Sequence, residues 1–211
     1  MSEYMFAKIL NISLLGLFSI LNHSGYNHNL TLFTKKVKDQ DIQSFLQNPL
    51  DLQKYKIGTE DRCNSGFATR EKYYYKPSYK GIYWTYFLCR NLSQNKSGNT
   101  QLQIVVYKKD KVGDYMDNKD SLISLADNEN DSTLNEANIV GRSYKDFVNQ
   151  YGSSAIAKDG LFFYQAKNKM SLLIYVDKGY RISWFMFVRL NRMINSFDEI
   201  PEKMKKFPFC G

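Results

Sequence analysis

Residues 143–188 contain the pattern of one short helix and three tightly connected strands, and this stretch constrains the fold most. Ser143 is a favourable N-cap, because its hydroxyl can accept a hydrogen bond from a free backbone N–H of the first turn. Asp146 follows at the positive end of the helix dipole, and Gly152 supplies a left-handed stop. One apolar stripe repeats between them at helical spacing: Tyr144, Phe147, Val148 and Tyr151.

Three runs of strand-forming residues follow this helix, at positions 161–164, 170–176 and 180–188. The polar segment 167–169 separates the first two runs. The sequence Asp-Lys-Gly at 177–179 separates the last two, with glycine where a hairpin turn needs a positive φ. Such short connections favour antiparallel neighbours. The stretch is therefore predicted to form an αβββ unit.

The same order of elements occurs earlier, with a helix at 41–47 and strand-like runs at 70–76, 82–90 and 101–108. We expect an α+β fold, with an antiparallel sheet or sheets packed on short helices. The repeated order raises the hypothesis of two tandem αβββ units, residues 26–112 and 139–211, joined by the acidic linker or loop 113–138. Acidic residues early and lysines late in segment 196–206 also predict a C-terminal helix.

The composition is that of a globular protein, because 43% of the 211 residues are hydrophobic and 15% are aromatic. The net charge is +8, although the segment 114–136 carries seven acidic residues and one lysine. The rest of the chain is therefore strongly basic, which suits an anionic surface or an acidic partner. The composition favours a simpler origin of this charge, a genome rich in AT, since Lys, Asn, Ile and Tyr are all abundant.

Residues 9–21 form a mostly apolar run that Lys8 precedes. A bilayer-spanning helix takes about 20 residues, so this run is too short, and it resembles the apolar core of a secretory signal peptide. We expect a signal peptide at 1–25 and a periplasmic or secreted protein. The alternative is a buried helix or strand of the mature fold.

Export would permit a disulfide between two of the three cysteines. Cys63 and Cys89 flank the tyrosine-rich segment, so we expect them to be paired, although Cys210 could replace either partner. The alternative is three unpaired thiols. No C-x-x-C pair occurs, and neither histidine lies near a cysteine, so we expect no metal site.

Sequence patterns of catalysis are weak throughout the chain. His23 and His28 are the two histidines and lie near the predicted cleavage point, so histidine-dependent catalysis is not expected. The acidic residues at 127, 129 and 131 alternate as in an EF-hand, but Ser132 and Asn138 occupy the positions that need Gly and Glu. We expect a solvated acidic loop there, with a weak, loosely built cation site as the alternative. We expect no cofactor and no enzymatic activity.

Aromatic residues alternate with lysines in segment 70–90, which makes it the strongest candidate for a binding surface. The candidate binding residues are Tyr73, Tyr75, Lys76, Tyr79, Tyr83, Trp84 and Tyr86. Tyrosine and tryptophan are favoured anchors at protein interfaces. The alternatives are a sheet pair with half of its tyrosines in the core, a glycan or lipid headgroup site, and a single-stranded nucleic acid site. Export argues against nucleic acid.

Three pieces of the second half resemble a known pattern: IVGRS at 139–143 with its helix to Gly152, LFFY at 161–164, and LLIYVDKG at 172–179. Together they are similar to the repeat of β-lactamase-inhibitor-protein-like and SmpA/OmlA-type outer-membrane proteins. The resemblance implies an extracytoplasmic, non-enzymatic binding role with a sheet face as contact surface.

We therefore expect an exported binding protein that recognises a protein partner, of the inhibitor or immunity type. The alternatives are a cell-envelope structural protein that binds anionic surfaces and an envelope enzyme that works without histidine.

Overall fold

The computed structural model describes residues 39–52, 62–88, 102–109 and 119–208. The predicted signal peptide, residues 1–25, lies outside these ranges, as do Cys89 and Cys210. The described residues belong to one unit, which spans 37–211. The localisation and the cysteine pairing therefore stay predictions.

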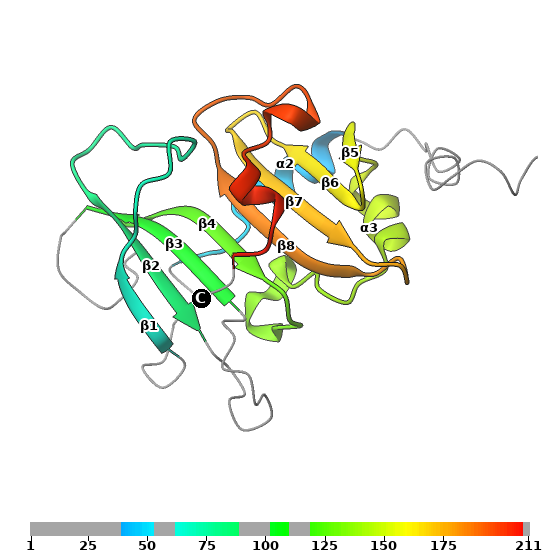
Figure 1. The fold of residues 1–211 in the computed structure, drawn as a ribbon, viewed down its shortest axis with the longest axis horizontal. Coiled ribbons are helices and arrows are strands. Elements are labelled where there is room, and N and C mark those ends of the chain that lie inside the picture. The colour runs from blue at the N-terminus through cyan, green and yellow to red at the C-terminus, as the bar shows by residue number, and fades with distance from the viewer. Residues whose placement is uncertain (1–38, 53–61, 89–101, 110–118, 209–211) are drawn as a thin grey trace, which may run out of the picture. The chain divides into compact units, whose positions relative to one another are not determined.

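The fold is α+β and is dominated by one antiparallel sheet of eight strands in the order β1-β2-β3-β4-β8-β7-β6-β5 (Figure 1). Its strands are β1 (Arg62–Phe67), β2 (Ile82–Leu88), β3 (Leu102–Lys108), β4 (Ser121–Asp127), β5 (Ile156–Lys158), β6 (Leu161–Gln165), β7 (Met170–Val176) and β8 (Ile182–Arg189). Every neighbouring pair is antiparallel. The strands predicted at 161–164, 170–176 and 180–188 correspond closely to β6, β7 and β8.

Strand β4 lies inside the acidic segment 113–138, for which a linker or loop was expected. Its last six residues are buried, and it pairs with β3 on one side and with β8 on the other. The surrounding acids obscured an apolar run that suits a strand buried on both faces. The prediction of a loop is wrong for residues 121–127, and one continuous sheet runs through both hypothesised units. A short 3-10 helix, η2 (Ser132–Ala137), follows the strand.

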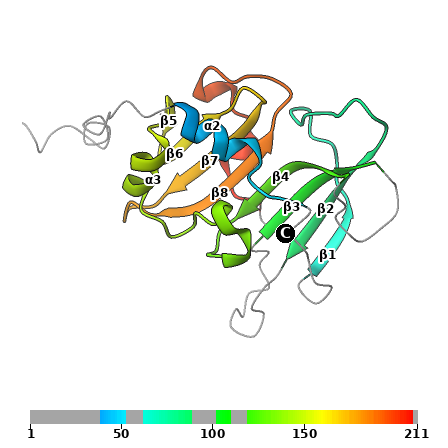
Figure 2. The ribbon, with the colours of Figure 1, turned by 180° about the vertical axis from the view of Figure 1, so that it is seen from behind.

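The two α-helices, α2 (Asp39–Gln47) and α3 (Tyr144–Tyr151), both cover one face of strands β6 to β8 (Figure 2). The ring of Phe45 on α2 lies 4.5 Å from that of Tyr151 on α3 and 5.5 Å from that of Phe187 on β8. Helix α2 thus packs on the second half of the sheet, not on the strands that follow it in sequence. We call this side of the sheet the helix face; the row Tyr86, Ile104, Leu125 and Phe187 runs across it.

Helix α3 begins and ends where the sequence predicts. Ser143 occupies the N-cap position, although its side chain makes no capping hydrogen bond. Gly152 has a φ of 98° and its N–H donates to the carbonyl of Val148, which closes the last turn. The buried stripe of the helix is formed by Tyr144, Phe147 and Val148. Amphipathic spacing therefore identified the packed side correctly.

The C-terminal segment forms two short 3-10 helices, η3 (Phe197–Glu199) and η4 (Glu202–Lys205), in place of the single helix predicted at 196–206. Pro201 separates them, and proline disrupts the interior of an α-helix because it lacks an N–H. The segment lies over the other side of β6 to β8, which we call the tail face (Figure 1). Its buried side chains there are Ile194, Ile200, Met204 and Phe207.

Candidate functional site

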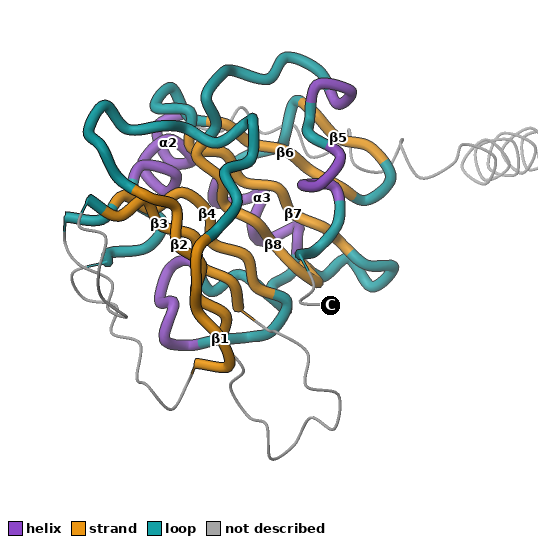
Figure 3. Tube along the Cα trace, turned by 60° about the vertical axis from the view of Figure 1, so that its left-hand side comes forward, coloured by secondary structure: helices purple, strands orange, loops and turns teal. Residues whose placement is uncertain are grey.

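The connection between β1 and β2, residues 68–81, contains most of the tyrosines that the sequence singles out; we call it the tyrosine loop (Figure 3). Residues 70–76 were expected to be a strand, but they form an irregular segment that reaches the end of β8. The N–H of Tyr75 donates to the carbonyl of Arg189 at 2.9 Å. The backbone and side-chain N–H groups of Asn191 donate to the carbonyls of Tyr73 (2.9 Å) and Lys72 (2.7 Å). Tertiary contacts with the far half of the sheet thus override local strand propensity.

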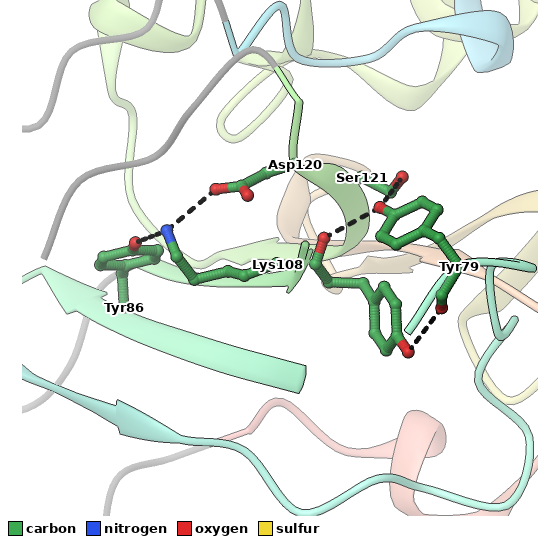
Figure 4. Close-up of polar contacts among 6 residues, drawn as sticks. Tyr79, Tyr86, Lys108, Asp120 and Ser121 are labelled. Carbon is green, nitrogen blue, oxygen red and sulfur yellow. Dashed lines mark hydrogen bonds and ion pairs between the residues drawn. The ribbon is translucent and has the colours of Figure 1, made fainter. Parts of the chain in front are cut away.

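Tyrosine hydroxyls fasten the loop to the sheet beneath it. The hydroxyl of Tyr79 donates to the carbonyl of Tyr107 at 3.2 Å, and that of Tyr107 donates back to the carbonyl of Tyr79 at 3.1 Å. The Tyr79 hydroxyl also lies 2.9 Å from Oγ of Ser121 (Figure 4). The hydroxyl of Tyr83 donates to the carbonyl of Tyr75 at 3.1 Å. Two of these bonds supply hydrogen-bond partners for loop carbonyls, those of Tyr75 and Tyr79.

The rings of the same residues pack in a continuous chain below the loop. Tyr73 and Tyr74 have ring centroids 5.1 Å apart, and Tyr74 lies 5.8 Å from Tyr83. Tyr107 then contacts both Tyr83 (4.8 Å) and Tyr79 (5.2 Å). Burial raises the pKa of Tyr73 and Tyr74, so both hydroxyls stay protonated and neutral at physiological pH. The cluster is a structural core.

The outward side of the tyrosine loop is basic. Its exposed cationic side chains are Arg70, Lys72, Lys76 and Lys80. Glu71 is the one acidic residue of the loop, and its carboxylate is paired with Lys203 at 2.8 Å. Because that acid is already paired, the loop presents a positive surface on a backbone fixed from below.

The seven candidate binding residues do not form one surface. Tyr73, Tyr75, Lys76 and Tyr79 lie on the tyrosine loop, whereas Tyr83, Trp84 and Tyr86 lie on β2. Neighbouring residues of a strand point to opposite faces, so Tyr83 lies under the loop while Trp84 and Tyr86 face the other side. Tyr86 is fully buried and cannot serve as a contact residue.

A buried ion pair accounts for the position of Tyr86. Nζ of Lys108 lies 3.0 Å from the carboxylate of Asp120 and donates to the hydroxyl of Tyr86 at 3.1 Å (Figure 4). Burial lowers the pKa of Lys108, but the hydrogen bonds with Asp120 and Tyr86 outweigh this effect and leave it raised. The lysine is therefore charged and compensated, a structural arrangement that sequence reasoning missed.

The predicted acidic loop at 127–131 differs from expectation at its first residue. Asp127 was placed in a solvated loop, but it is the last residue of β4 and is 1% exposed. Its Oδ1 accepts from the N–H of Glu129 at 2.9 Å, whereas Oδ2 is buried without a hydrogen-bond partner. Burial raises the pKa of this carboxyl to about 8. The side chain is therefore mostly a neutral acid at pH 7.

Among the residues that the structure describes, no three His, Cys, Asp or Glu side chains gather closely enough to hold a metal ion. No helix in the same ranges combines the length and apolar character needed to cross a membrane. Compared with models of protein families, with curated proteins and with solved structures, the chain matches none.

Proposed function

We propose that this protein is a non-enzymatic binding protein that recognises an acidic protein surface through the tyrosine loop, as an inhibitor or immunity protein would. The observation that supports this proposal most is the contrast between the two sides of the loop. Its inner side is held by buried tyrosines, and its outer side carries four exposed cations. The proposed binding surface is therefore the tyrosine loop alone. It leaves out Tyr83, Trp84 and Tyr86 on β2, which the sequence also suggested.

A fixed loop favours binding because less conformational entropy is lost when the complex forms. Ordering a flexible side chain or loop at an interface costs about 0.5–1.5 kcal/mol for each immobilised side chain. Here the backbone of the loop is already tied to Arg189 and Asn191. The exposed lysines would steer an acidic partner toward this surface and raise the association rate.

The proposal also places the protein outside the cytoplasm. It rests on the apolar run at 9–21 and on the possibility of a disulfide that includes Cys63. An inhibitor or immunity protein of a secreted toxin would act in this compartment.

The test uses a variant in which the loop is charge-reversed, Lys72→Glu/Lys76→Glu/Lys80→Glu. Tagged wild-type protein and this variant are used side by side to capture partners from an extract of the cells that produce the protein. Complexes are then analysed by light scattering for fixed stoichiometry. We expect the variant to bind at least about tenfold more weakly, because three attractive contacts become repulsive.

A matched control keeps the net charge change but leaves the loop intact. The control variant carries the same change at three exposed lysines in the second half of the chain, Lys145→Glu/Lys167→Glu/Lys178→Glu. Equal loss of the partner in both variants would mean that overall charge, not the loop, determines binding, and the proposal would fail.

The same basic loop also supports the rival function, adhesion to an anionic envelope surface. Sedimentation with phosphatidylcholine vesicles, with and without phosphatidylglycerol, separates the two functions. Binding to the anionic vesicles that the loop variant loses, with no stoichiometric protein complex, would favour the rival.

A further inference from the structure

A hollow of ≈ 360 Å³ opens on the tail face, far along the chain from the tyrosine loop. Side chains from five segments line it, and the argument below uses Asn128, Asp159, Tyr175, Trp184 and Lys206. Lys205 also lines the hollow, but its ammonium group is paired with Glu202. Its size is at the lower end of the range of about 300–1,000 Å³ for small-molecule sites. It would therefore accept one or two rings rather than an extended ligand.

One wall of the hollow is an aromatic platform. Tyr175 on β7 and Trp184 on β8 are cross-strand partners whose rings stack at 5.8 Å with an interplanar angle of 19°. Phe207 supports the indole from the C-terminal segment at 6.1 Å. Tyr175 remains 36% exposed, so the platform is open to a ligand.

The turn that contains Gly160 lies close to the ring of Tyr175. Gly160 has a φ of +79°, and a Cβ there would lie 3.0 Å from the carbonyl oxygen of Val176 and 3.3 Å from the Tyr175 ring. Glycine thus permits a close approach of backbone and ring that any other residue would disturb.

The polar groups at the edge of the platform include both acceptors and a donor, so they complement a ligand that both donates and accepts hydrogen bonds. Oδ1 of Asn128 is buried and has no hydrogen-bond partner. Asp159 is exposed and offers a carboxylate that accepts. Lys206 is exposed, pairs with no acid in the described ranges, and donates.

We propose that this hollow binds the terminal pyranose ring of an oligosaccharide. The apolar face of a sugar ring matches the Tyr175–Trp184 platform, and its hydroxyls donate to Asn128 and Asp159 while accepting from Lys206. A phosphate ion or a carboxylate side chain fits poorly, because it has no apolar ring face for the platform and the Asp159 carboxylate repels it. The site shares no residue with the tyrosine loop, so this inference goes beyond the proposed function and does not depend on it.

The two tryptophans of the chain make the site directly measurable. Trp84 lies on β2, on the helix face, so a Trp84→Phe background leaves Trp184 as the fluorescent reporter. In this background, the protein is titrated with maltotriose, cellotriose and triacetylchitotriose. For a ligand of one or two bound rings, we expect a saturable change in Trp184 emission with a dissociation constant on the order of 1 mM for at least one probe.

Tyr175→Ala tests the platform, and Tyr180→Ala is its matched control. Tyr180 is an exposed tyrosine on the same hairpin and does not line the hollow. We expect Tyr175→Ala to weaken binding at least about tenfold and Tyr180→Ala to leave it unchanged. Saturation-transfer NMR on the wild-type protein, with the ring C–H protons of the sugar as readout, gives an independent measurement that does not require the variant to fold.

The proposal would be overturned if none of the three saccharides produced a saturable change in Trp184 emission, or if Tyr175→Ala bound saccharide as tightly as wild type. Saturable binding of inorganic phosphate or poly-glutamate in place of saccharides would also overturn it. The charge-reversed loop variant should retain saccharide binding, so a failure here is distinguishable from a failure of the proposed function.

Discussion

Asp127 provides a quantitative test of the core, because its carboxyl is buried at the end of β4 with one oxygen unpartnered. Burial raises its pKa from the ordinary value of 3.8 to about 8, and the nearby carboxylates of Asp131 and Glu129 add to the shift. Between these two pKa values the folded protein holds a proton that the unfolded chain releases. The carboxyl of Asp127 therefore makes its full contribution to the free energy of unfolding below about pH 4, and this contribution is lost as the pH rises toward 8.

The size of the effect follows from the shift. Each pKa unit corresponds to about 1.4 kcal/mol, so raising the pH from about 4 to 7 should remove on the order of 4 kcal/mol through this group alone. Asp127→Asn replaces the neutral acid by a neutral amide of the same shape, and its oxygen can still accept from Glu129. The free energy of unfolding of the variant should equal that of wild type near pH 4 and exceed it as the pH rises.

Urea unfolding of both proteins at a series of pH values measures this difference. Asp159→Asn is the control, because Asp159 is exposed and its positive φ of 52° suits asparagine as well. We expect the control to show no comparable trend. The assignment of a neutral buried acid would be refuted by either of two results. One is a difference in the free energy of unfolding between Asp127→Asn and wild type that stays constant across this pH range, and the other is a variant that is less stable than wild type at pH 7.

Three further predictions concern the loop, the platform turn and the cysteines. Tyr79→Phe removes two hydroxyl contacts and should lower the free energy of unfolding by about 1 kcal/mol, measured in urea. Gly160→Ala should cost about 1–2 kcal/mol in the same assay because of its positive φ, whereas Gly66→Ala, where a Cβ meets nothing within 4 Å, should cost less. If Cys63 and Cys89 are paired, non-reducing peptide mass spectrometry should recover them as a linked peptide; free thiols at both positions would contradict the pairing.

Local patterns in the sequence were sufficient for α3 and for β6 to β8. Apolar spacing, a terminal glycine and tight turns specify these elements within short windows, so no distant contact is needed to identify them. The break in the C-terminal helix was also visible in the sequence at Pro201. The opposite orientation of Tyr83 and Tyr86 follows from the two-residue period of a strand, once β2 is recognised.

The remaining features depend on contacts between distant segments. The run Tyr73 to Tyr75 has strand composition, yet it is held as a loop by hydrogen bonds to residues more than 100 positions away. Helix α2 precedes β1 but packs on β8 through Phe45. The hollow around Trp184 combines five segments, so no single window of sequence contains it.

Amide hydrogen exchange shows whether the tyrosine loop is a contact surface that is already fixed in the free protein. We expect the amides of Tyr74 and Tyr75, which donate to backbone carbonyls, to exchange slowly in the free protein. We also expect protection across residues 70–80 to increase further in the stoichiometric complex with the captured partner. Exchange of these amides at the rate of an unstructured chain, or a complex whose added protection lies elsewhere on the protein, would contradict the proposal.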